Sequence, residues 1–217
     1  MSDIDPVQLA SLLCSKLCHD LLSPVGALSN GLELLSDEKD PDMRDRCFEL
    51  LEQSAQISTD KLKFFRLAFG AAGGFGDMID VDEPRALVDA LVAKNERVEA
   101  NWALATARLP KGAVKVLLNF AQMGLDALVR GGTLDIGAEM RGGATEIVVR
   151  ATGPKIAFDQ TIGKALSGEG ELTSRTAPAF MLCELAEADG GGLQYHLGEG
   201  SLVLGAELPT DTDGLIG

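Results

Sequence analysis

The sequence predicts an α plus α/β fold, in which a hairpin of two long helices precedes an α/β sandwich. Three observations carry this prediction. Residues 6–69 place apolar side chains at steps of three and four, the spacing of amphipathic helices, and one charged turn interrupts them. Residues 70–76 are rich in glycine and alanine and mark a domain boundary. After them, helix-like and strand-like segments alternate, as they do in α/β domains.

The bulk composition argues against several classes of partner. With 217 residues, 46% of them hydrophobic, the chain can build one medium or two small cores. A net charge of −14 argues against nucleic acid and anionic membranes, because both are bound by a basic surface. The apolar runs fall short of the roughly 18 residues that span a bilayer, and the first residues lack a signal-peptide pattern. We therefore expect a cytoplasmic protein.

The four cysteines do not change this expectation. Cys14, Cys18, Cys47 and Cys183 match no disulfide framework, so reduced thiols are expected. Cys14 and Cys18 share one helix face, but His19 is rotated off that face, and no second pair of ligands follows. We therefore predict packed thiols rather than a metal site.

The first predicted helix runs over residues 6–35 and starts after Asp5. Its apolar stripe consists of Leu13, Leu17, Leu21, Pro24, Leu28, Gly31 and Leu35. At 100° per residue, His19 lies off this stripe, on an outward flank of the helix. The same flank holds Leu22, Ser23, Gly26 and Asn30.

Pro24 should disturb the helix next to His19. Proline has no N–H, so Pro24 cannot bond the carbonyl of Asp20, and the turn that holds His19 should be loosened or kinked. A solvated surface histidine without function is the simplest interpretation of His19 by itself. An exposed imidazole beside an acid, just before a helix break, is nevertheless an unusual way to build a core. The surroundings therefore favour chemistry at His19.

The second helix is predicted over residues 42–69, after a charged turn at 36–41. Its apolar positions are Cys47, Leu50, Leu51, Ile57, Leu62, Phe65 and Phe69. A lone hairpin cannot cover the apolar stripes of both helices, whereas two copies paired about a twofold axis form a four-helix bundle. We therefore predict a homodimer through residues 7–69. The alternative is a monomer in which the second domain covers the stripe.

The remaining pattern predicts a mixed sheet with helices gathered on one face. Helices are expected over residues 83–95, 111–130, 158–166 and 176–189. Strands are expected over residues 102–107 and in two hairpins, 133–140 with 145–151 and 193–197 with 201–208. The predicted domains are residues 1–70, the helical hairpin, and residues 77–217, the α/β sandwich.

The segment from His19 to Pro24 resembles the H-box of dimerisation and phosphotransfer domains in two-component signalling. The wider strings KLCHDLLSP and FFRLAFGA, together with the chain length, resemble the ChpT family of histidine phosphotransferases from alphaproteobacteria. The resemblance implies that His19 carries a phosphoryl group. It also implies that Asp20 accepts a hydrogen bond from the ring and keeps the attacking nitrogen unprotonated. A helix-surface charge is the simpler interpretation of Asp20.

The resemblance also implies a docking surface for a receiver domain on the flank that follows His19. The expected contacts are Leu22, Ser23, Gly26 and Asn30, with Lys16 facing the incoming phosphate. Lys16 is equally well read as a solvated lysine. The second helix adds the candidates Lys61, Phe64 and Arg66, whereas His196, the other histidine, is expected to be structural.

Residues 111–208 resemble the ATP-binding domain of histidine kinases. Residues 116–132 are similar to that family's N-box helix, and residues 179–193 to its late helix and following strand. The positions that would bind nucleotide differ, however. The Mg²⁺-ligating asparagine falls on Met123, whose thioether is a poor ligand for a hard cation.

Two further nucleotide-binding motifs also lack the residues that contact nucleotide in the kinase family. In the G1 motif, the carboxylate that bonds adenine falls on Ala151, and the second glycine on Lys155. In the G2 motif, the glycines fall on Thr176 and Pro178, and a proline offers no N–H to a phosphate. Three separate losses predict that the chain binds no ATP and no cofactor of its own. The resemblance to the phosphotransferase family implies that Mg²⁺ comes with the partner receiver domain.

These features favour a histidine phosphotransferase, an intermediate of a phosphorelay rather than an ATP-dependent kinase. We expect His19 to accept a phosphoryl group from the receiver aspartate of a hybrid histidine kinase and to pass it to response regulators. Neutral imidazole suits this role because it is nucleophilic near a pH of about 7. Two alternatives are an autophosphorylating histidine kinase with a degenerate site and a non-catalytic dimeric signalling scaffold.

Overall fold

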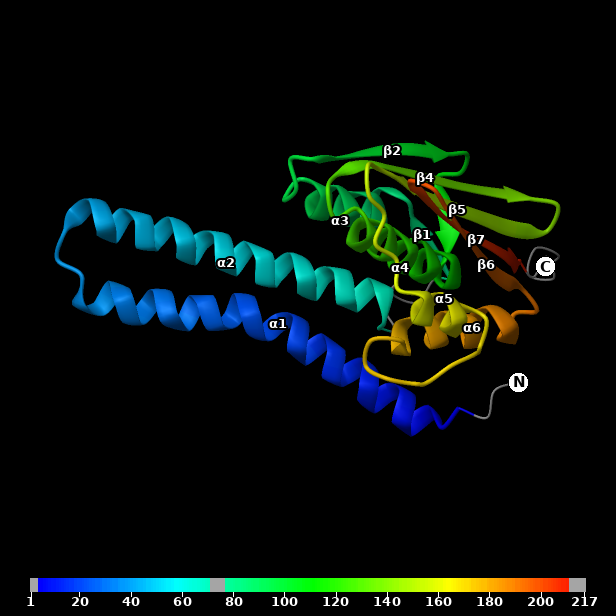
Figure 1. The fold of residues 1–217 in the computed structure, drawn as a ribbon, viewed down its shortest axis with the longest axis horizontal. Helices are drawn as coiled ribbons and strands as arrows, with labels where there is room; N and C mark the ends of the chain where they lie inside the picture. The colour runs from blue at the N-terminus through cyan, green and yellow to red at the C-terminus, as the bar shows by residue number, and fades with distance from the viewer. Residues whose placement is uncertain (1–3, 71–76, 211–217) are drawn as a thin grey trace.

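The computed structural model describes residues 4–70 and 77–210. Two long helices, α1 (Pro6–Asp37) and α2 (Pro41–Ala68), lie side by side and antiparallel (Figure 1). Each begins with a proline after an aspartate whose side chain accepts a backbone N–H of the first turn. Arg44 closes the turn between them by donating to the carbonyls of Leu35 and Glu38. The predicted hairpin is confirmed.

The predicted stripe of α1 faces α2. Pro24 is buried and the other six stripe residues are partly buried, whereas most other positions of α1 are exposed. The helices approach closely at Gly31, where an added Cβ would lie 2.8 Å from Leu51 Cδ2. Large apolar side chains nevertheless remain exposed on both helices, including Leu32, Phe48, Leu50 and Leu62. The homodimer remains a prediction, and these side chains are the surface that it would cover.

The second part of the chain contains a five-stranded sheet in the order β2-β4-β5-β7-β6. Its strands are β2 (Val98–Leu104), β4 (Gly132–Arg141), β5 (Ala144–Thr152), β6 (Gly192–Gly198) and β7 (Ser201–Pro209). Only the β2–β4 pair is parallel, and the other three pairs are antiparallel. Gly142 and Gly143 turn the β4–β5 hairpin with positive φ angles of 62° and 83°.

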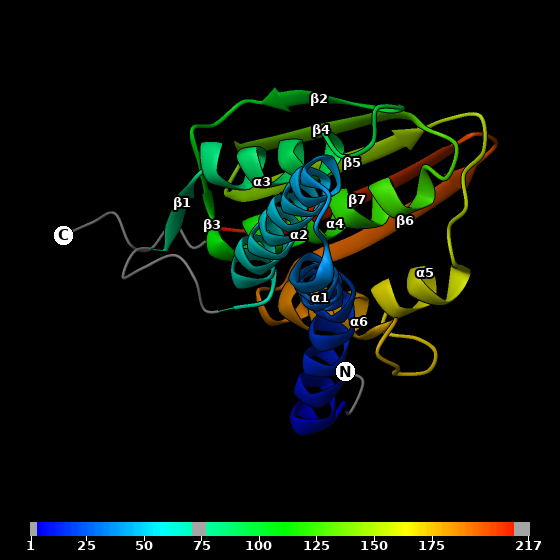
Figure 2. The ribbon, with the colours of Figure 1, turned by 90° about the vertical axis from the view of Figure 1, so that its left-hand side faces the viewer.

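Helices cover one face of this sheet (Figures 1 and 2). They are α3 (Asp82–Val92), α4 (Lys111–Ala127) and α6 (Ala177–Ala188), with α5 (Gln160–Leu166) packed beside α6. The predicted fold class, a helical hairpin followed by a mixed α/β sandwich, is therefore confirmed. No helix of the described segments is long and apolar enough to cross a bilayer.

The structure differs from the sequence prediction in short elements and boundaries. It adds a small sheet of β1 (Met78–Asp80) and β3 (Arg108–Pro110), whose three-residue strands are too short to show alternation. The strand predicted over residues 102–107 instead begins at Val98, where the alternating burial starts. Helix α4 ends at Ala127, before the predicted end at residue 130. The predicted linker lies mostly outside the described residues, since residues 71–76 are not described.

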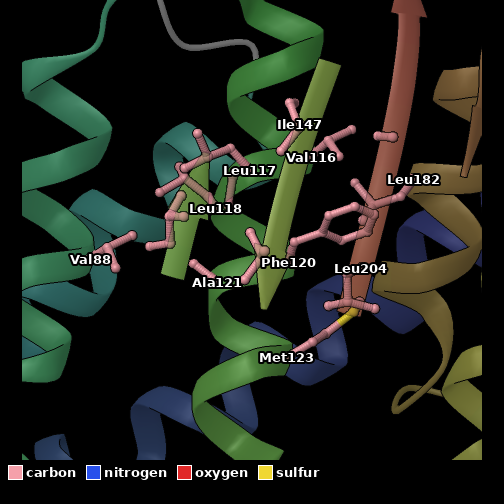
Figure 3. Packing of buried hydrophobic residues seen from close by; sticks show 14 of the residues in the cluster. Val88, Val116, Leu117, Leu118, Phe120, Ala121, Met123, Ile147, Leu182 and Leu204 are labelled. Atoms are coloured by element: carbon pink, nitrogen blue, oxygen red, sulfur yellow. The ribbon is translucent and has the colours of Figure 1, made fainter. Parts of the chain in front are cut away.

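Helix α4 lies at the centre of the hydrophobic core. Figure 3 shows its Val116, Phe120 and Met123 gathered with Ile147 and Leu204 of the sheet. The same core continues into the end of α2 through Phe64, Leu67 and Ala68. A polar contact closes this junction, because buried Asn119 donates its side-chain amide to the carbonyls of Lys115 and Ala68 at 2.9 and 3.4 Å. The hairpin and the sandwich are thus packed together at the end of α2.

Candidate functional site

His19 projects from the middle of α1 into solvent, with 86% of its side chain exposed. It lies one turn before Pro24, and α1 bends part-way along its length (Figure 1). An imidazole this open is available to a macromolecular partner. The sequence prediction of an outward-facing His19 is confirmed.

Asp20 contacts His19 and Lys16 with different carboxylate oxygens. Its Oδ1 lies 3.4 Å from His19 Nδ1, while its Oδ2 accepts a hydrogen bond from Lys16 Nζ at 2.8 Å. Partial burial by itself raises the pKa of Asp20, but the hydrogen bonds from Lys16 and His19 and the charges of Lys16 and Lys61 together outweigh it, so that this pKa lies below its ordinary value. Asp20 is therefore held as a carboxylate facing one ring nitrogen, which leaves Nε2 directed elsewhere.

Lys61 reaches the same turn from α2. Its Nζ donates a hydrogen bond to the backbone carbonyl of Asp20 at 2.7 Å, across a sequence separation of 41 residues. Lys16 and Lys61 thus both bind Asp20, one at the side chain and one at the main chain. The prediction that these lysines face an incoming receiver missed this arrangement, because the pairing of α2 with α1 cannot be read from the sequence.

The flank that follows His19 carries the predicted docking residues. Leu22 is 68% exposed, and Ser23 and Asn30 are exposed beside it. Gly26 is half-buried, but an added Cβ would meet no atom within 4 Å. The four residues therefore form one open strip, which we call the docking flank. Whether a receiver uses this strip stays a prediction.

One of two further α2 candidates for the predicted docking surface does not fit it. Phe64 is only 3% exposed and lies in the core next to α4, so its assignment to a receiver contact is wrong. It packs inward because the end of α2 is covered by the sandwich rather than by solvent. Arg66 is exposed and pairs with Glu83 of α3 at 3.1 Å.

His196 lies exposed on β6, at the edge of the sheet, and is not part of the core.

Several positions that the sequence resemblance assigns to nucleotide contacts are buried or closely packed in this chain. Met123 and Ala151 are buried in the common core. Gly153, which follows β5, has no free space, because an added Cβ would approach the carbonyl oxygen of Gly131 within 2.5 Å. The segment after it is tied to the end of α4 by a hydrogen bond from Ala157 N to the carbonyl oxygen of Ala127 at 2.9 Å.

The start of α6 offers few free donors to a phosphate. Thr176 N donates to Thr173 Oγ1, and Ala177 N donates to the Thr173 carbonyl, while Pro178 has no N–H. The Thr176 hydroxyl is also engaged, because it donates to the Glu171 carbonyl at 2.7 Å. Nor do three His, Cys, Asp or Glu side chains come together anywhere in residues 4–70 and 77–210 as a metal site requires.

Comparison with known proteins gives three strong similarities. Residues 81–201 match the model of a family described as the histidine phosphotransferase C-terminal domain. The chain is 33% identical over 208 residues to protein phosphotransferase ChpT of Brucella abortus (strain 2308), covering 94% of this chain and 97% of that protein. A solved structure of a bacterial phosphotransferase is 31% identical, with a TM-score of 0.80 over 94% of this chain and 97% of that one.

Proposed function

Since the chain belongs to the histidine phosphotransferase family and acts in a phosphorelay, we propose that His19 is the residue that carries the phosphoryl group. His19 would accept this group from the aspartyl phosphate of one receiver domain, that of a hybrid histidine kinase. It would then pass the group to the receivers of response regulators. The observation that supports this assignment is the exposed imidazole of His19 with Asp20 facing one of its two nitrogens.

The arrangement suits attack by Nε2. With its proton on Nδ1, next to Asp20 Oδ1, His19 offers the lone pair of Nε2 to the phosphorus atom. The new N–P bond forms as the P–O bond to the receiver aspartate breaks, and that aspartate leaves as a carboxylate. Nε2 has no proton to lose, and Asp20 stabilises the positive charge on the phosphorylated ring. The 3.4 Å separation can shorten when a receiver docks.

A receiver would dock along Leu22, Ser23, Gly26 and Asn30, where an apolar side chain stands exposed among small and polar neighbours. In-line positioning and neutralisation of charge supply most of the catalysis of phosphoryl transfer. The Mg²⁺ that contributes to both would come with the receiver, because hard cations need oxygen ligands gathered at one place. Lys16 remains beside the site, but its ammonium group is already engaged by Asp20.

We further propose that the chain neither binds nor consumes ATP. Methionine and alanine side chains occupy the positions of the metal ligand and the adenine acceptor, and both are buried. At the start of α6, the N–H groups of Thr176 and Ala177 are bonded within the chain and Pro178 has none. The donor of the phosphoryl group would therefore be a phosphorylated protein and not ATP.

The functional protein is, we propose, a cytoplasmic homodimer. Val25 and Leu32 lie roughly 120° to 140° around α1 from His19, so pairing through that face would leave both copies of His19 open. Phe48 and Leu62 of α2 remain exposed and could complete an apolar interface of a four-helix bundle. Burying these side chains is the driving force for the second copy.

Label transfer from a phosphorylated receiver tests the proposed function. We expect the wild-type chain to take up label, His19→Gln to take up none, and His196→Gln, the matched control at an exposed histidine, to behave as wild type. Incubation with labelled ATP alone should give no incorporation. Label from ATP on His19 would instead support the autophosphorylating kinase. Unchanged signalling by His19→Gln, without any label, would support the scaffold.

A further inference from the structure

The carbonyl group of Asp20 lies where the hydrogen bonds of α1 are interrupted. In a regular helix this carbonyl accepts the N–H of the residue four positions later. That residue is Pro24, which has no N–H and is buried against α2. Without another donor, a partly buried carbonyl would remain unpaired next to His19, and an unpaired buried carbonyl destabilises a fold.

Lys61 provides this donor from the other helix. Its Nζ lies 2.7 Å from the Asp20 carbonyl oxygen, the short distance of a charge-assisted hydrogen bond. Lys61 is half-buried between the helices, so its ammonium group lies in a medium where such a bond is strengthened. The contact also joins α2 to the turn of α1 that bears His19 and Asp20.

We propose that Lys61 is a positioning residue for phosphoryl transfer, which takes the place of the N–H that Pro24 lacks and so fixes the turn that bears His19. The assignment rests on the proposed role of His19. Pro24 removes one backbone hydrogen bond from this turn, and the hydrogen bond from Lys61 replaces it. The His19 ring and the Asp20 carboxylate therefore keep their relative orientation. Lys61 acts through Asp20 and need not touch the receiver or the phosphoryl group.

Pro24 and Lys61 should then depend on each other. If Pro24 is replaced by alanine, the new N–H of residue 24 can bond the Asp20 carbonyl in the ordinary helical way. In the Pro24→Ala background, the Asp20 carbonyl would no longer need the hydrogen bond from Lys61. A lysine that served only as a surface charge or as a receiver contact would show no such dependence.

The test is a double-mutant cycle of Pro24→Ala and Lys61→Met. Thermal unfolding should show a loss of melting temperature for Lys61→Met in the wild-type background, and a loss at most half as large in the Pro24→Ala background. Equal losses in the two backgrounds would overturn the proposal. Lys63→Met, at an exposed lysine two residues away, is the matched control and should shift neither melting temperature. The melting temperature does not depend on phosphorylation of His19, so the same coupling between Pro24 and Lys61 should appear in the His19→Gln background. The positioning role and the proposed function can therefore fail separately.

Transfer kinetics provide the second readout. For Lys61→Met we expect the rate at saturating phosphorylated receiver to fall on the order of tenfold, as for the loss of one charged hydrogen bond. The receiver concentration at half-maximal rate should change less than about twofold, because docking is not the step affected. Lys61→Arg, which keeps a cationic donor, should restore most of the rate. A raised half-saturating concentration with an unchanged maximal rate would identify Lys61 as a receiver contact and overturn the positioning role.

Discussion

Asp20 is the residue on which the interactions around His19 converge. One carboxylate oxygen lies 3.4 Å from His19 Nδ1, the other accepts from Lys16 at 2.8 Å, and the backbone carbonyl accepts from Lys61 at 2.7 Å. Each contact uses a different atom of Asp20, so single substitutions can separate orientation of the ring, charge and backbone geometry.

Replacing Asp20 by asparagine removes the charge that faces Nδ1 with little change in shape. The proton is then held less firmly on Nδ1 and the phosphorylated ring loses its counter-charge, so we expect transfer to His19 to slow by about 10- to 100-fold. The measurement is label uptake from a phosphorylated receiver at saturation. Glu33→Gln, at an exposed carboxylate on the same flank of α1, should keep the wild-type rate. Equal effects of the two substitutions would contradict a specific role for Asp20.

The Lys16–Asp20 pair makes stability depend on pH. The pKa of Asp20 lies below its ordinary value in the folded chain, because Lys16, with smaller contributions from His19 and Lys61, offsets the opposing effect of partial burial. The pair therefore stabilises the fold at pH values above about 4 and loses this effect as the pH falls through the lowered pKa. Lys16→Met should destabilise the chain by up to about 1 kcal/mol at neutral pH.

Denaturant unfolding at several pH values checks this prediction. The difference between wild type and Lys16→Met should shrink as the pH is lowered from about 7 to about 3. Carboxyl titration by NMR should show the pKa of Asp20 rising in the variant. A difference that is independent of pH would mean that Lys16 acts through packing of its aliphatic stem and not through charge.

The sequence predicted the residues of this site better than their contacts. The helical spacing placed His19 outside the apolar stripe, and the resemblance to the H-box singled out Asp20. The Lys16–Asp20 ion pair could have been predicted from the sequence, because residues four apart on a helix are neighbours. Lys61 gave no comparable signal. Its contact depends on the register of α2 against α1, which tertiary packing decides over a separation of 41 residues.

Within α1, two glycines have opposite surroundings and should respond oppositely to alanine. A Cβ at Gly26 meets no atom within 4 Å, while one at Gly31 would lie 2.8 Å from Leu51 Cδ2 of α2. Gly26→Ala should therefore raise the free energy of unfolding by about 0.5–1 kcal/mol, because alanine loses less backbone entropy in a helix. Gly31→Ala should lower it, because the two helices must separate or Leu51 must change rotamer.

Receiver binding separates the role of Gly26 in docking from its effect on the helix. If the docking flank is used, Gly26→Ala should weaken the interaction with a receiver although the fold becomes more stable. The measurements are denaturant unfolding and the receiver concentration at half-maximal transfer. A more stable variant with unchanged half-saturation would show that the receiver avoids this turn of α1.

At the level of helices, the two members of the hairpin were predictable to different degrees. The stripe of α1 was correct because its residues are partly or fully buried throughout, mainly against α2, although the start of α1 also packs beside α6. In α2 the assignment failed at Phe64, because this helix faces α1 along most of its length and the sandwich at its end. A single helical period cannot describe a helix whose partner changes part-way.

For the molecule as a whole, the sandwich was predictable in outline and its attachment was not. Alternating burial in β5 and the glycines of its hairpin show in the sequence. The junction with α2 instead depends on Asn119, which lies in the helix that resembles the N-box and donates to the Ala68 carbonyl at 3.4 Å. Nothing in the sequence distinguishes that use of an asparagine from an ordinary helix position.

Two exposed leucines of α1 should separate assembly from partner recognition. Leu22 and Leu32 are both well exposed, 68% and 59%, but they point to different faces of the helix. Leu32→Glu should dissociate the proposed homodimer, because a charge in an apolar interface is left without a partner. Leu22→Glu should leave the dimer intact and raise the receiver concentration needed for transfer on the order of tenfold or more.

Light scattering and transfer kinetics on both variants decide between the assignments. Each residue is exposed within a single chain, so neither substitution should lower the melting temperature of the sandwich. If Leu32→Glu keeps the dimer mass and Leu22→Glu loses it, the two faces have been exchanged and the receiver must approach from the other side of α1. If both variants remain dimeric and transfer normally, neither leucine lies in an interface, and both the proposed dimer face and the proposed docking flank are wrong. His19 would then carry out transfer without the docking flank.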